Sequence, residues 1–444
     1  MTFEDLNLNT PLQNALTDLE YIYPTPIQVQ ALPIVLSGKD VVGVAQTGTG
    51  KTFAYLLPIL KQLKFSEQKH PRVLIMVPTR ELVVQVVEEV EKLTEYINTR
   101  VVGVYGGTNI NTQKQLVYDG VDILVATPGR LLDLALSGNL RLKHIKQLVI
   151  DEVDEMLNLG FRTQLTNILD LLPQKRQNLM FSATLTEDVE KLINDFFYQP
   201  EKIEVVPVGT PLELINQSAY LVPNFYTKIN LLNHILEDKN LEKVLIFVDS
   251  KKLADRMADH LDSKYNEVIG VMHSNKSQNY RLNAIKKFEN GEHRILIATE
   301  IIARGLDILD VSHVINFDTP DIPENYIHRI GRTGRADKKG GAITFVNEVE
   351  VPSMELIEEL MGQEIPKVEI PKEVEISAVF TDDEIPNLAD KHYLKEAKIS
   401  RSKGAFQEKS AKNSKTNQGG SYKRKIKAKY SKPKTRSAKT KRKN

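Results

Sequence analysis

The sequence predicts two α/β domains in succession, each a parallel sheet covered by helices on both faces. Short apolar and β-branched runs recur along the chain, amphipathic stretches of helical period separate them, and this pattern occurs twice. Near-continuous apolar strands that alternate with helices are typical of parallel sheets buried on both sides. A length of 444 residues suits two such domains with a further segment.

The first half contains six candidate strands, which are Val41–Ala45, Val73–Val77, Val101–Tyr105, Ile123–Ala126, Leu148–Ile150 and Leu179–Ser182. Helical signals lie before and between them. Thr10 followed by Pro11 predicts a helix with Thr10 as its N-cap and proline in the first position. A longer helix is expected at Glu81–Tyr96, whose apolar residues follow the 3–4 spacing of one helix face.

The second half contains five candidate strands, which are Val244–Val248, Val268–Met272, Ile295–Ala298, Val314–Phe317 and Ala342–Val346. We expect the first domain at about 1–205 and the second at about 216–365. A stretch rich in Pro and Gly at 206–215 is the expected linker. Ligands of open parallel sheets bind at the carboxyl ends of the strands, so motifs at strand ends carry the functional signal.

Charge is distributed very unevenly along the chain. The formal net charge is +1, but residues 391–444 hold 20 Lys and Arg and only 2 Glu, so the other 390 residues carry −17. Residues 366–390 are rich in Pro, Glu and Asp and are expected to be extended. The basic tail from Lys391 onward is expected to be disordered when free. An acidic body with a basic tail indicates a polyanionic partner.

Several classes of protein are disfavoured by what the sequence lacks. There is no cysteine, which excludes disulfides and thiolate metal sites and is typical of a reducing compartment. No apolar run approaches the roughly 18 residues of a membrane span. The N-terminal residues lack the basic and apolar regions of a secretory signal. We therefore expect a cytoplasmic protein without a membrane partner.

A glycine-rich segment at Ala45–Thr52 fits the phosphate-loop pattern G-x-x-x-x-G-K-[ST], with Ala in place of the first Gly. A strand is expected before it and a helix after it, at Phe53–Leu63. Lys51 would reach the β- and γ-phosphates, and the Thr52 hydroxyl would bind Mg²⁺. Backbone N–H groups of the loop would hold the phosphates at Thr47, Gly48, Thr49 and Gly50. The alternative is a glycine-rich turn without a ligand.

An acidic segment, Asp151–Asp154, directly follows an apolar strand. Asp151 suits a metal-binding role, and Glu152 could polarise the attacking water. The alternative is an acidic first turn of a helix, where carboxylates favour the helix dipole. Beside a phosphate loop, the catalytic interpretation is preferred.

In their order along the chain, these motifs resemble those of DEAD-box RNA helicases, which are superfamily 2 ATPases. Asp151–Asp154 matches the motif that names the family, with Val in place of Ala. Pro24–Gln28, with Phe3 upstream, resembles the adenine-sensing Q motif. Ser182–Thr184 matches the segment that couples ATP hydrolysis to strand separation. The resemblance covers roughly residues 3–346. It implies two RecA-like domains, with ATP and Mg²⁺ as cofactors, RNA as the partner, and local rather than processive unwinding.

The segment that resembles the Q motif offers a physical basis for adenine recognition. The Gln28 amide can form two hydrogen bonds with N6 and N7 of adenine, which guanine would not satisfy. Phe3 could stack on the base, and its alternative is a small core anchor. By resemblance, Asp307 would approach the ribose.

A second charged segment, His328–Arg335, holds four basic residues and two glycines within eight positions. Guanidinium groups match phosphate oxygens in a bidentate way, and glycine lets the backbone approach closely. The resemblance implies that Arg332 and Arg335 are arginine fingers, which meet ATP only when the two domains close over it. It also implies that nucleotide and RNA states communicate through Asp154, Ser182, Thr184 and His328.

Other strand-end motifs resemble the RNA-binding track of the family. The residues concerned are Thr79, Arg80, Gly106, Gly107, Thr127, Gly129 and Arg130 in the first half, with Arg281 and Thr299 in the second. Glycine, hydroxyl and arginine groups suit sugar–phosphate contacts and predict little sequence specificity. Taken singly, each motif could also be an ordinary turn or helix cap.

The basic tail interleaves Lys and Arg with four aromatic residues, which suits phosphate neutralisation and stacking on unpaired bases. We expect it to tether a monomeric core to structured RNA such as ribosomal RNA, with a role in ribosome assembly. A solubilising extension is the alternative. For the whole chain, the predicted function is an ATP-dependent RNA helicase. The rivals are an ATP-dependent RNA clamp or scaffold without productive unwinding, and a DNA helicase.

Overall fold

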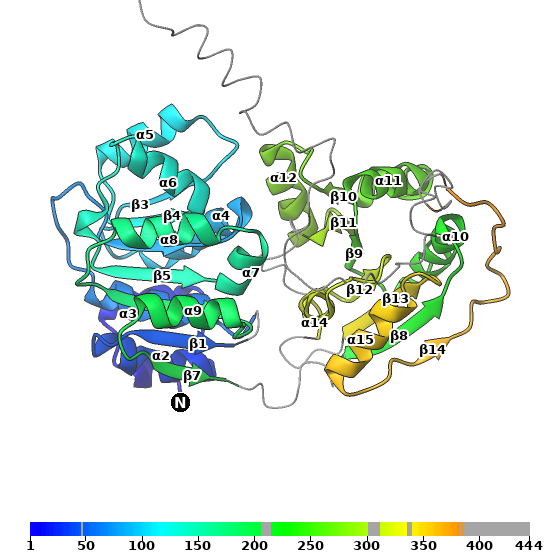
Figure 1. Ribbon diagram of the computed structural model, residues 1–444, viewed down its shortest axis with the longest axis horizontal. Coiled ribbons are helices and arrows are strands. Elements are labelled where there is room, and N and C mark those ends of the chain that lie inside the picture. Colours follow the sequence, from blue (N-terminus) through cyan, green and yellow to red (C-terminus); the bar gives the residue numbers. More distant parts are fainter. Residues whose placement is uncertain (46–47, 206–214, 301–310, 335–339, 382–383, 385–444) are drawn as a thin grey trace, which may run out of the picture. The chain divides into compact units, whose positions relative to one another are not determined.

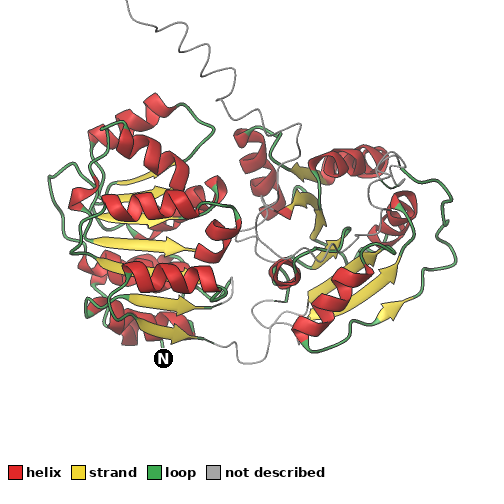
Figure 2. Ribbon diagram, viewed as in Figure 1, coloured by secondary structure: helices red, strands yellow, loops and turns green. Residues whose placement is uncertain are grey.

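Two seven-stranded sheets, each flanked by helices, organise the chain in the computed structural model (Figures 1 and 2). The structure describes residues 1–45, 48–205, 215–300, 311–334, 340–381 and 384. All strand pairings among these residues are parallel. The predicted fold class, two RecA-like α/β domains, is confirmed.

The first sheet has the strand order β3-β4-β2-β5-β6-β1-β7. Its strands are β1 (Val41–Val44), β2 (Val73–Met76), β3 (Val101–Val104), β4 (Ile123–Ala126), β5 (Gln147–Asp151), β6 (Gln177–Ser182) and β7 (Glu201–Glu204). The α-helices around it are α1 (Thr10–Asp18), α2 (Pro26–Leu36), α3 (Lys51–Gln62), α4 (Arg80–Leu93), α5 (Ile110–Asp119), α6 (Pro128–Leu136), α7 (Val153–Asn158), α8 (Arg162–Leu171) and α9 (Glu187–Phe196). Two 3₁₀ helices complete this half, η1 (Phe3–Leu6) and η2 (Leu142–His144).

The second sheet has the strand order β10-β11-β9-β12-β13-β8-β14. Its strands are β8 (Ile215–Leu221), β9 (Val244–Val248), β10 (Ile269–Met272), β11 (Ile295–Thr299), β12 (His313–Asn316), β13 (Gly340–Val346) and β14 (Lys367–Val368). The helices described are α10 (Phe225–Leu236), α11 (Lys251–Tyr265), η4 (Asn266–Val268), α12 (Gln278–Glu289), α14 (Pro323–Ile330) and α15 (Val351–Met361).

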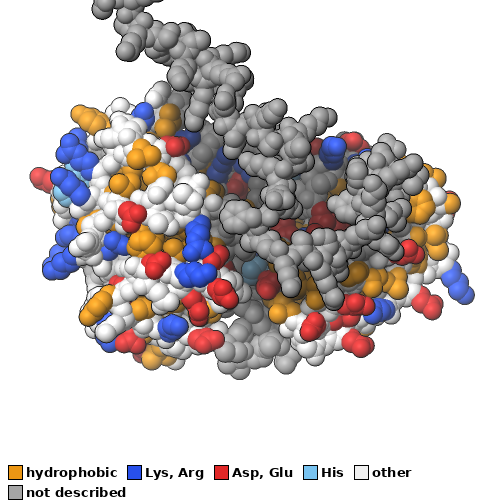
Figure 3. Space-filling model, viewed as in Figure 1, with side chains coloured by type: hydrophobic (Ala, Val, Ile, Leu, Met, Phe, Trp, Pro, Cys, Tyr) orange, Lys and Arg blue, Asp and Glu red, His pale blue; other side chains and the backbone are white. Residues whose placement is uncertain are grey.

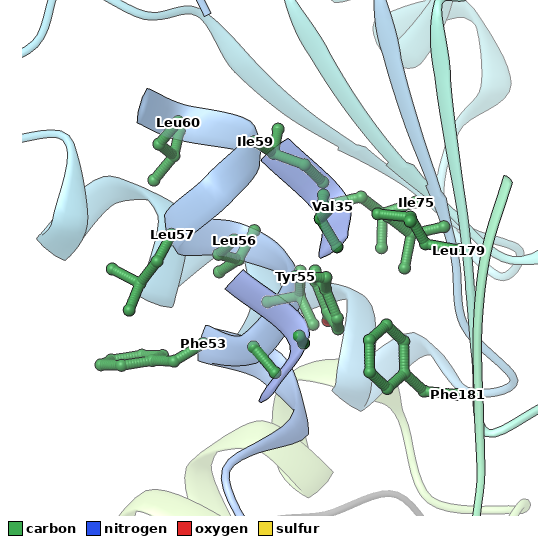
Figure 4. Packing of buried hydrophobic residues seen from close by; sticks show 14 of the residues in the cluster. Val35, Phe53, Tyr55, Leu56, Leu57, Ile59, Leu60, Ile75, Leu179 and Phe181 are labelled. Carbon is green, nitrogen blue, oxygen red and sulfur yellow. The ribbon is translucent and has the colours of Figure 1, made fainter. Parts of the chain in front are cut away.

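Successive residues of each strand point to opposite faces of the sheet, which therefore has a hydrophobic core on either side. In β2, Val73 and Ile75 join the core beneath α2, α3 and α4, whereas Leu74 and Met76 join the core beneath α6, α8 and α9. Figure 4 shows part of the first core, with the rings of Tyr55 and Phe181 side by side. Burial on both faces is the reason why these strands read as uninterrupted apolar runs.

All eleven predicted strands are present, although several differ by a residue or more at their ends. Three described strands were not predicted, namely β7, β8 and β14. They have few buried apolar residues, because β7 and β14 are edge strands and burial alternates along β8. The prediction of Thr10 as an N-cap was wrong. Asn9 caps α1, because its side-chain oxygen accepts a hydrogen bond from the Leu12 N–H at 3.3 Å.

The segment after α15 lies against the second sheet and α10. Lys367 and Val368 add β14 to the edge of β8, and Val374 is buried in the core that includes α10. The backbone of Ser377 makes hydrogen bonds with Asn224 and Thr227 at the start of α10. The 366–390 region was expected to be extended, and residues 382–383 and 385–390 of it lie outside the described residues. The basic tail lies outside the described residues.

Among the helices that the structure describes, none combines the length and apolar character that a bilayer crossing requires.

A buried ion-pair cluster joins the segments that enter β2, β3 and β4. The Asp122 carboxylate lies 2.8 Å from Nη2 of Arg72 and 2.9 Å from Nε of Arg100. Burial alone would raise the pKa of Asp122, but hydrogen bonds from Arg100 and Arg72 outweigh it and hold this pKa below its usual range. The contribution to stability is therefore present above pH of about 4 and is lost as the pH falls through the lowered pKa.

We predict that Asp122→Asn lowers the free energy of unfolding by roughly 3 kcal/mol, because two guanidinium groups lose their counter-charge. Denaturant titration measures the change. Asp119→Asn, at an exposed carboxylate nearby, is the control. A loss no greater than that of the control would contradict the assigned role of Asp122.

Candidate active site

The carboxyl ends of three neighbouring strands, β5, β6 and β1, meet at one edge of the first sheet. The acidic segment follows β5, Ser182–Thr184 follows β6, and the phosphate loop follows β1. Asp151 and Ser182, which lie 99 and 130 residues after Thr52 in the sequence, thereby become neighbours of the phosphate loop. Parallel pairing brings them together, since it directs all carboxyl ends to the same edge.

The phosphate loop ends in two glycines with left-handed backbone conformations. Gly48 has φ +82° and Gly50 has φ +87°, and Gly50 directly precedes α3. The positive φ of Gly50 favours glycine, and a Cβ atom there would lie 2.3 Å from Nε2 of Gln28. The Gln28 amide donates to the Gly50 carbonyl at 3.1 Å and accepts from the Thr25 N–H at 2.9 Å. The predicted adenine-reading residue is thus joined directly to the phosphate loop. Thr47 lies outside the described residues.

Lys51 begins α3 with a buried ammonium group. Its exposed fraction is 6%, and within the described part of the chain its Nζ atom has no hydrogen-bond partner. An unpaired buried charge is costly, whereas the first turn of a helix and an ammonium group together form a strong anion site. Lys51 therefore fits a bound phosphate. Thr52 follows it on the same first turn.

Asp151 is buried at the end of β5 with both carboxylate oxygens engaged. Oδ2 accepts a hydrogen bond from the Tyr55 hydroxyl at 3.1 Å, and Oδ1 accepts one from the Glu152 N–H at 3.0 Å. Burial raises the pKa of Asp151, an effect opposed by the charge of Lys51 and by the Tyr55 hydrogen bond. The carboxylate is therefore fixed in orientation beside the phosphate loop.

Glu152 occupies an unusual backbone conformation. It has φ +52° and ψ +51°, in the left-handed region that costs an L-residue about 1–2 kcal/mol. Its backbone is the N-terminal boundary of α7, which turns the chain sharply after β5. Burial raises the pKa of Glu152 to about 7, against the opposing charge of Lys51. Such strain at the end of a strand is typical of functional sites.

Asp154 connects the acidic segment to the end of β6. Its Oδ2 atom accepts hydrogen bonds from the backbone N–H of Ala183 at 3.2 Å, and from the N–H and hydroxyl of Thr184 at 3.0 Å each. The Ser182 hydroxyl donates to the Thr184 carbonyl at 2.7 Å. Three of the four predicted coupling residues therefore form one hydrogen-bonded cluster.

The predicted RNA contacts of the first half gather at the carboxyl ends of β2, β3 and β4. The guanidinium group of Arg80 lies against Gly106 and Gly107, and a Cβ atom at Gly107 would come within 2.0 Å of it. Arg130 donates to the side chain of Gln113 at 2.6 Å and to the Thr108 carbonyl at 3.1 Å. These contacts connect two arginines through one loop.

Two helices begin at the same edge. Thr79 caps α4, because its hydroxyl accepts from the Leu82 N–H at 3.2 Å. Thr127 precedes α6 without a capping hydrogen bond from its side chain, and a Cβ atom at Gly129 would meet open space. The first turn of α6 therefore offers backbone N–H groups at an unobstructed surface, as a phosphate contact requires.

The predicted residues of the second half lie at the carboxyl ends of its strands or on adjoining helices. Thr299 ends β11, and Arg281 is buried in the first turn of α12. His328 is half-buried in α14, while Arg332 is buried just after this helix. Asp307 and Arg335 lie outside the described residues.

Comparison with known proteins agrees with this geometry. The DEAD/DEAH box helicase model matches residues 25–192, and the helicase conserved C-terminal domain model matches residues 227–337. The DEAD-box ATP-dependent RNA helicase CshA of Geobacillus kaustophilus is 38% identical over 370 residues, which cover 83% of this chain and 79% of that protein. The chain belongs to the DEAD-box ATP-dependent RNA helicases.

Other relatives and solved structures support the same family. The ATP-dependent RNA helicase RhlB of Pseudomonas syringae pv. tomato is 39% identical over 372 residues, covering 82% of this chain and 93% of RhlB. The structure of Dbp5 from S. cerevisiae, bound to RNA and ADP BeF3, has a TM-score of 0.76 at 29% identity and covers 83% of this chain and 96% of Dbp5. Mss116p bound to ssRNA and AMP-PNP has a TM-score of 0.74 at 31% identity, with coverages of 83% and 78%.

One aromatic assignment for this helicase needs correction. Phe3 has an exposed fraction of 4% and belongs to the core beneath α1, α2 and α3, so its ring is a core anchor. Tyr21, which the sequence reasoning missed, is 48% exposed and packs edge-to-face on Phe53 with ring centroids 5.1 Å apart. Its position seven residues before Gln28 could have drawn attention to it.

An ionic network around the buried guanidinium group of Arg329, beneath α14, was also missed. Nη2 of Arg329 lies 2.8 Å from the Glu300 carboxylate and 3.4 Å from that of Asp249, and Nη1 donates to the Asp318 carbonyl at 2.8 Å. Asp249 is about half exposed, and its partial burial raises its pKa to about 7, with the charge of Asp318 adding to this effect. The network fixes the helix that carries His328 and precedes Arg332.

Lys228 extends this network toward the start of α15. The buried ammonium group lies 3.3 Å from Asp318 and 3.0 Å from Glu350. The Glu350 carboxylate also accepts from the backbone N–H of Asn347 at 2.8 Å. Lys228, Asp318 and Glu350 come from three separate segments, so no local sequence pattern signals their association.

We predict that Tyr55→Phe lowers the free energy of unfolding by roughly 1–2 kcal/mol, because the buried Asp151 carboxylate loses its hydroxyl donor. The ring still packs beside Phe181, so the fold is retained. Denaturant titration provides the measurement, with Tyr198→Phe at an exposed tyrosine as the control. Equal stability of the two variants would argue against a structural hydrogen bond at Tyr55.

Proposed function

We propose that the edge formed by β5, β6 and β1 hydrolyses ATP with Mg²⁺, and that RNA-dependent closure of the two domains activates this step. The observation that carries the proposal is the buried, unpaired Nζ of Lys51 next to the carboxylates that follow β5. An anion at Lys51 would neutralise the ammonium group, and a divalent cation would neutralise the carboxylates. Mg²⁺ bound to ATP brings both charges at once.

The proposed roles follow from the chemistry of each group. Lys51 holds the β- and γ-phosphates, together with the backbone N–H groups of the loop residues Thr47–Gly50. The Thr52 hydroxyl and Asp151 would hold Mg²⁺, which prefers oxygen ligands and would stabilise charge on the transferring phosphoryl group. Glu152 orients the attacking water, and its fixed left-handed backbone holds the carboxylate at the strand end.

Base recognition involves the Q motif and the aromatic residue upstream. Gln28 bonds the adenine edge, and its contact with Gly50 transmits base binding to the phosphate loop. Tyr21 replaces Phe3 as the proposed stacking residue, because it has exposed ring surface. In the second domain, Asp307 approaches the ribose.

Arg332 and Arg335 are proposed to stabilise the transition-state charge when the second domain closes over ATP. Arginine fingers contribute about 10³–10⁵ to the rate in related phosphoryl-transfer enzymes. The cluster of Asp154, Ser182 and Thr184 joins the acidic segment to the end of β6. His328 would transmit changes in this cluster to the second domain. Hydrolysis and RNA contact would thereby become coupled.

RNA is proposed to run along the ends of β2, β3 and β4 through backbone contacts. Arg80 and Arg130 would contact phosphates, and glycines at the same edge let the sugar–phosphate backbone approach. Thr79 and Thr127 lie at helix starts where N–H groups favour phosphate. Thr299 and Arg281 would add contacts from the second domain. Closure on this track would separate short duplexes locally.

We predict that Glu152→Gln lowers RNA-stimulated ATP turnover by roughly 10²–10⁴-fold, because the amide cannot accept a proton from water. Turnover is measured with RNA, with DNA and with neither, and strand displacement is followed on a short duplex. Glu190→Gln, at an exposed glutamate of α9, serves as the control. Full turnover of Glu152→Gln would contradict the assigned role.

Stimulation by DNA alone would favour a DNA helicase, and ATP turnover without strand displacement would favour a clamp.

The remaining proposals concern the cellular setting. We infer that the basic tail tethers a monomeric, cytoplasmic helicase to structured RNA such as ribosomal RNA during ribosome assembly. The tail charge of +18 and the absence of cysteine support this setting.

Removal of residues 391–444 is expected to weaken binding to structured RNA and to flatten its dependence on salt, because fewer phosphates are neutralised. Affinity is measured at several salt concentrations, and light scattering gives the mass of the particle in solution. A tail of the same length with Gln at every Lys and Arg controls for chain length and should behave like the deletion. Unchanged affinity and slope would refute the tether.

A further inference from the structure

The opposite edge of the first sheet carries a concentration of positive charge that the helicase site does not use. Three segments lead into β2, β5 and β6, namely 64–72, 141–147 and 173–178, and we call them the amino-edge patch. Together they hold eight Lys or Arg and one Glu. This contrasts with the charge of −17 on the chain outside its basic tail.

The three segments form one continuous surface. The Lys146 N–H donates to the Arg72 carbonyl at 2.7 Å, and the Gln177 N–H donates to the Lys146 carbonyl at 2.9 Å. The rings of His70 and His144 stack with centroids 4.8 Å apart. Because β2, β5 and β6 are neighbours about 4.8 Å apart, the patch spans roughly 10 Å across the sheet.

Much of this charge is not neutralised within the described part of the chain. Arg72 is paired with Asp122, but Lys143, Lys146 and Lys175 are exposed and form no ion pair with a described carboxylate. The pKa of His70 is lowered by burial and then by the positive charges of its surroundings. Figure 3 shows Lys and Arg side chains gathered around a histidine at the left edge of the first domain.

Aromatic rings adjoin these charges. Tyr118 is 70% exposed, and the ammonium group of Lys69 lies 5.3 Å from its ring centroid. Phe65, within the patch, is 68% exposed. Basic groups with exposed aromatic rings are the combination that binds unpaired nucleic acid, through phosphate neutralisation and base stacking.

We propose that the amino-edge patch is a second RNA-binding surface, which holds a flanking single-stranded segment of the RNA engaged at the carboxyl edge. The five residues of β5 separate the two edges by roughly 15 Å, so each edge contacts a different stretch of RNA. The basic tail of this chain is excluded as the occupant because its charge has the same sign. The exposed rings favour RNA over an acidic protein.

The test uses the full chain and a triple variant, Lys69→Gln, Lys143→Gln and Lys175→Gln. Binding is measured against salt for a single-stranded RNA of about 10 nucleotides, which one site can fill, and for an RNA several times longer. For the long RNA, we expect the slope of log affinity against log salt to fall in magnitude by about 2. Three lysines are removed, and each lost phosphate contact lowers the slope by about 0.7. Affinity for the short RNA is expected to be unchanged.

A matched control replaces three exposed lysines elsewhere, which are Lys202, Lys239 and Lys372, by Gln. It removes the same charge and should leave binding of the long RNA nearly intact. Arg at the three patch positions should restore the wild-type slope, and unchanged affinity for the short RNA shows that the Gln variant folds.

Equal slopes for the patch variant and the control on long RNA would overturn the proposal. So would an equal loss on the short RNA, because the patch would then belong to the carboxyl-edge track. A competition experiment adds polyglutamate or unlabelled RNA at equal charge. If polyglutamate displaces the long RNA from the patch as readily as unlabelled RNA does, the patch is a surface for acidic proteins and the proposal is overturned. RNA-stimulated ATP turnover on the short RNA tests the carboxyl-edge site separately.

Discussion

Parallel strand pairing is the constraint on which the rest of the structure depends. Since neighbouring strands run the same way, each sheet has one edge of carboxyl ends and one edge of amino ends. In the first sheet, the carboxyl edge joins the phosphate loop, the acidic segment and the end of β6. The amino edge gathers the lysines, arginines and histidines that precede the strands. Parallel pairing thus places the nucleotide site and the basic surface at opposite edges of the same sheet.

Several residues of the nucleotide site have a charge state or a backbone conformation that is unfavourable in a folded protein. Lys51 carries a buried charge without a described partner, Asp151 and Glu152 have raised pKa values, and Glu152 is in a left-handed conformation. None of these features by itself stabilises the fold. The hydrophobic cores on both faces of the sheet hold them in place, and a bound nucleotide with its metal would relieve the charge imbalance. Stability of the domain and affinity for ATP are therefore linked at the same residues.

How far the sequence predicts this structure depends on the range of the interactions. Eleven strands were predicted because burial on both faces leaves an apolar run, whereas β7 and β8 escaped because they are only partly buried. The phosphate loop, the acidic segment and Ser182–Thr184 follow β1, β5 and β6, and parallel pairing directs these strand ends to one edge. The network around Arg329 was not foreseen, since its partners come from distant segments. Phe3 was misassigned because an aromatic residue near a ligand motif can equally be a core anchor.

The most direct measurement is the gain in unfolding free energy that ATP with Mg²⁺ gives to the wild-type helicase and to Lys51→Met. Methionine preserves the length of the side chain and removes the charge. If Lys51 is the buried partner of the phosphates, the wild type gains about 2.7 kcal/mol at an ATP concentration 100 times its Kd. Lys51→Met should gain almost nothing at that concentration. An equal gain by both proteins would contradict the assignment of this edge as the ATP site.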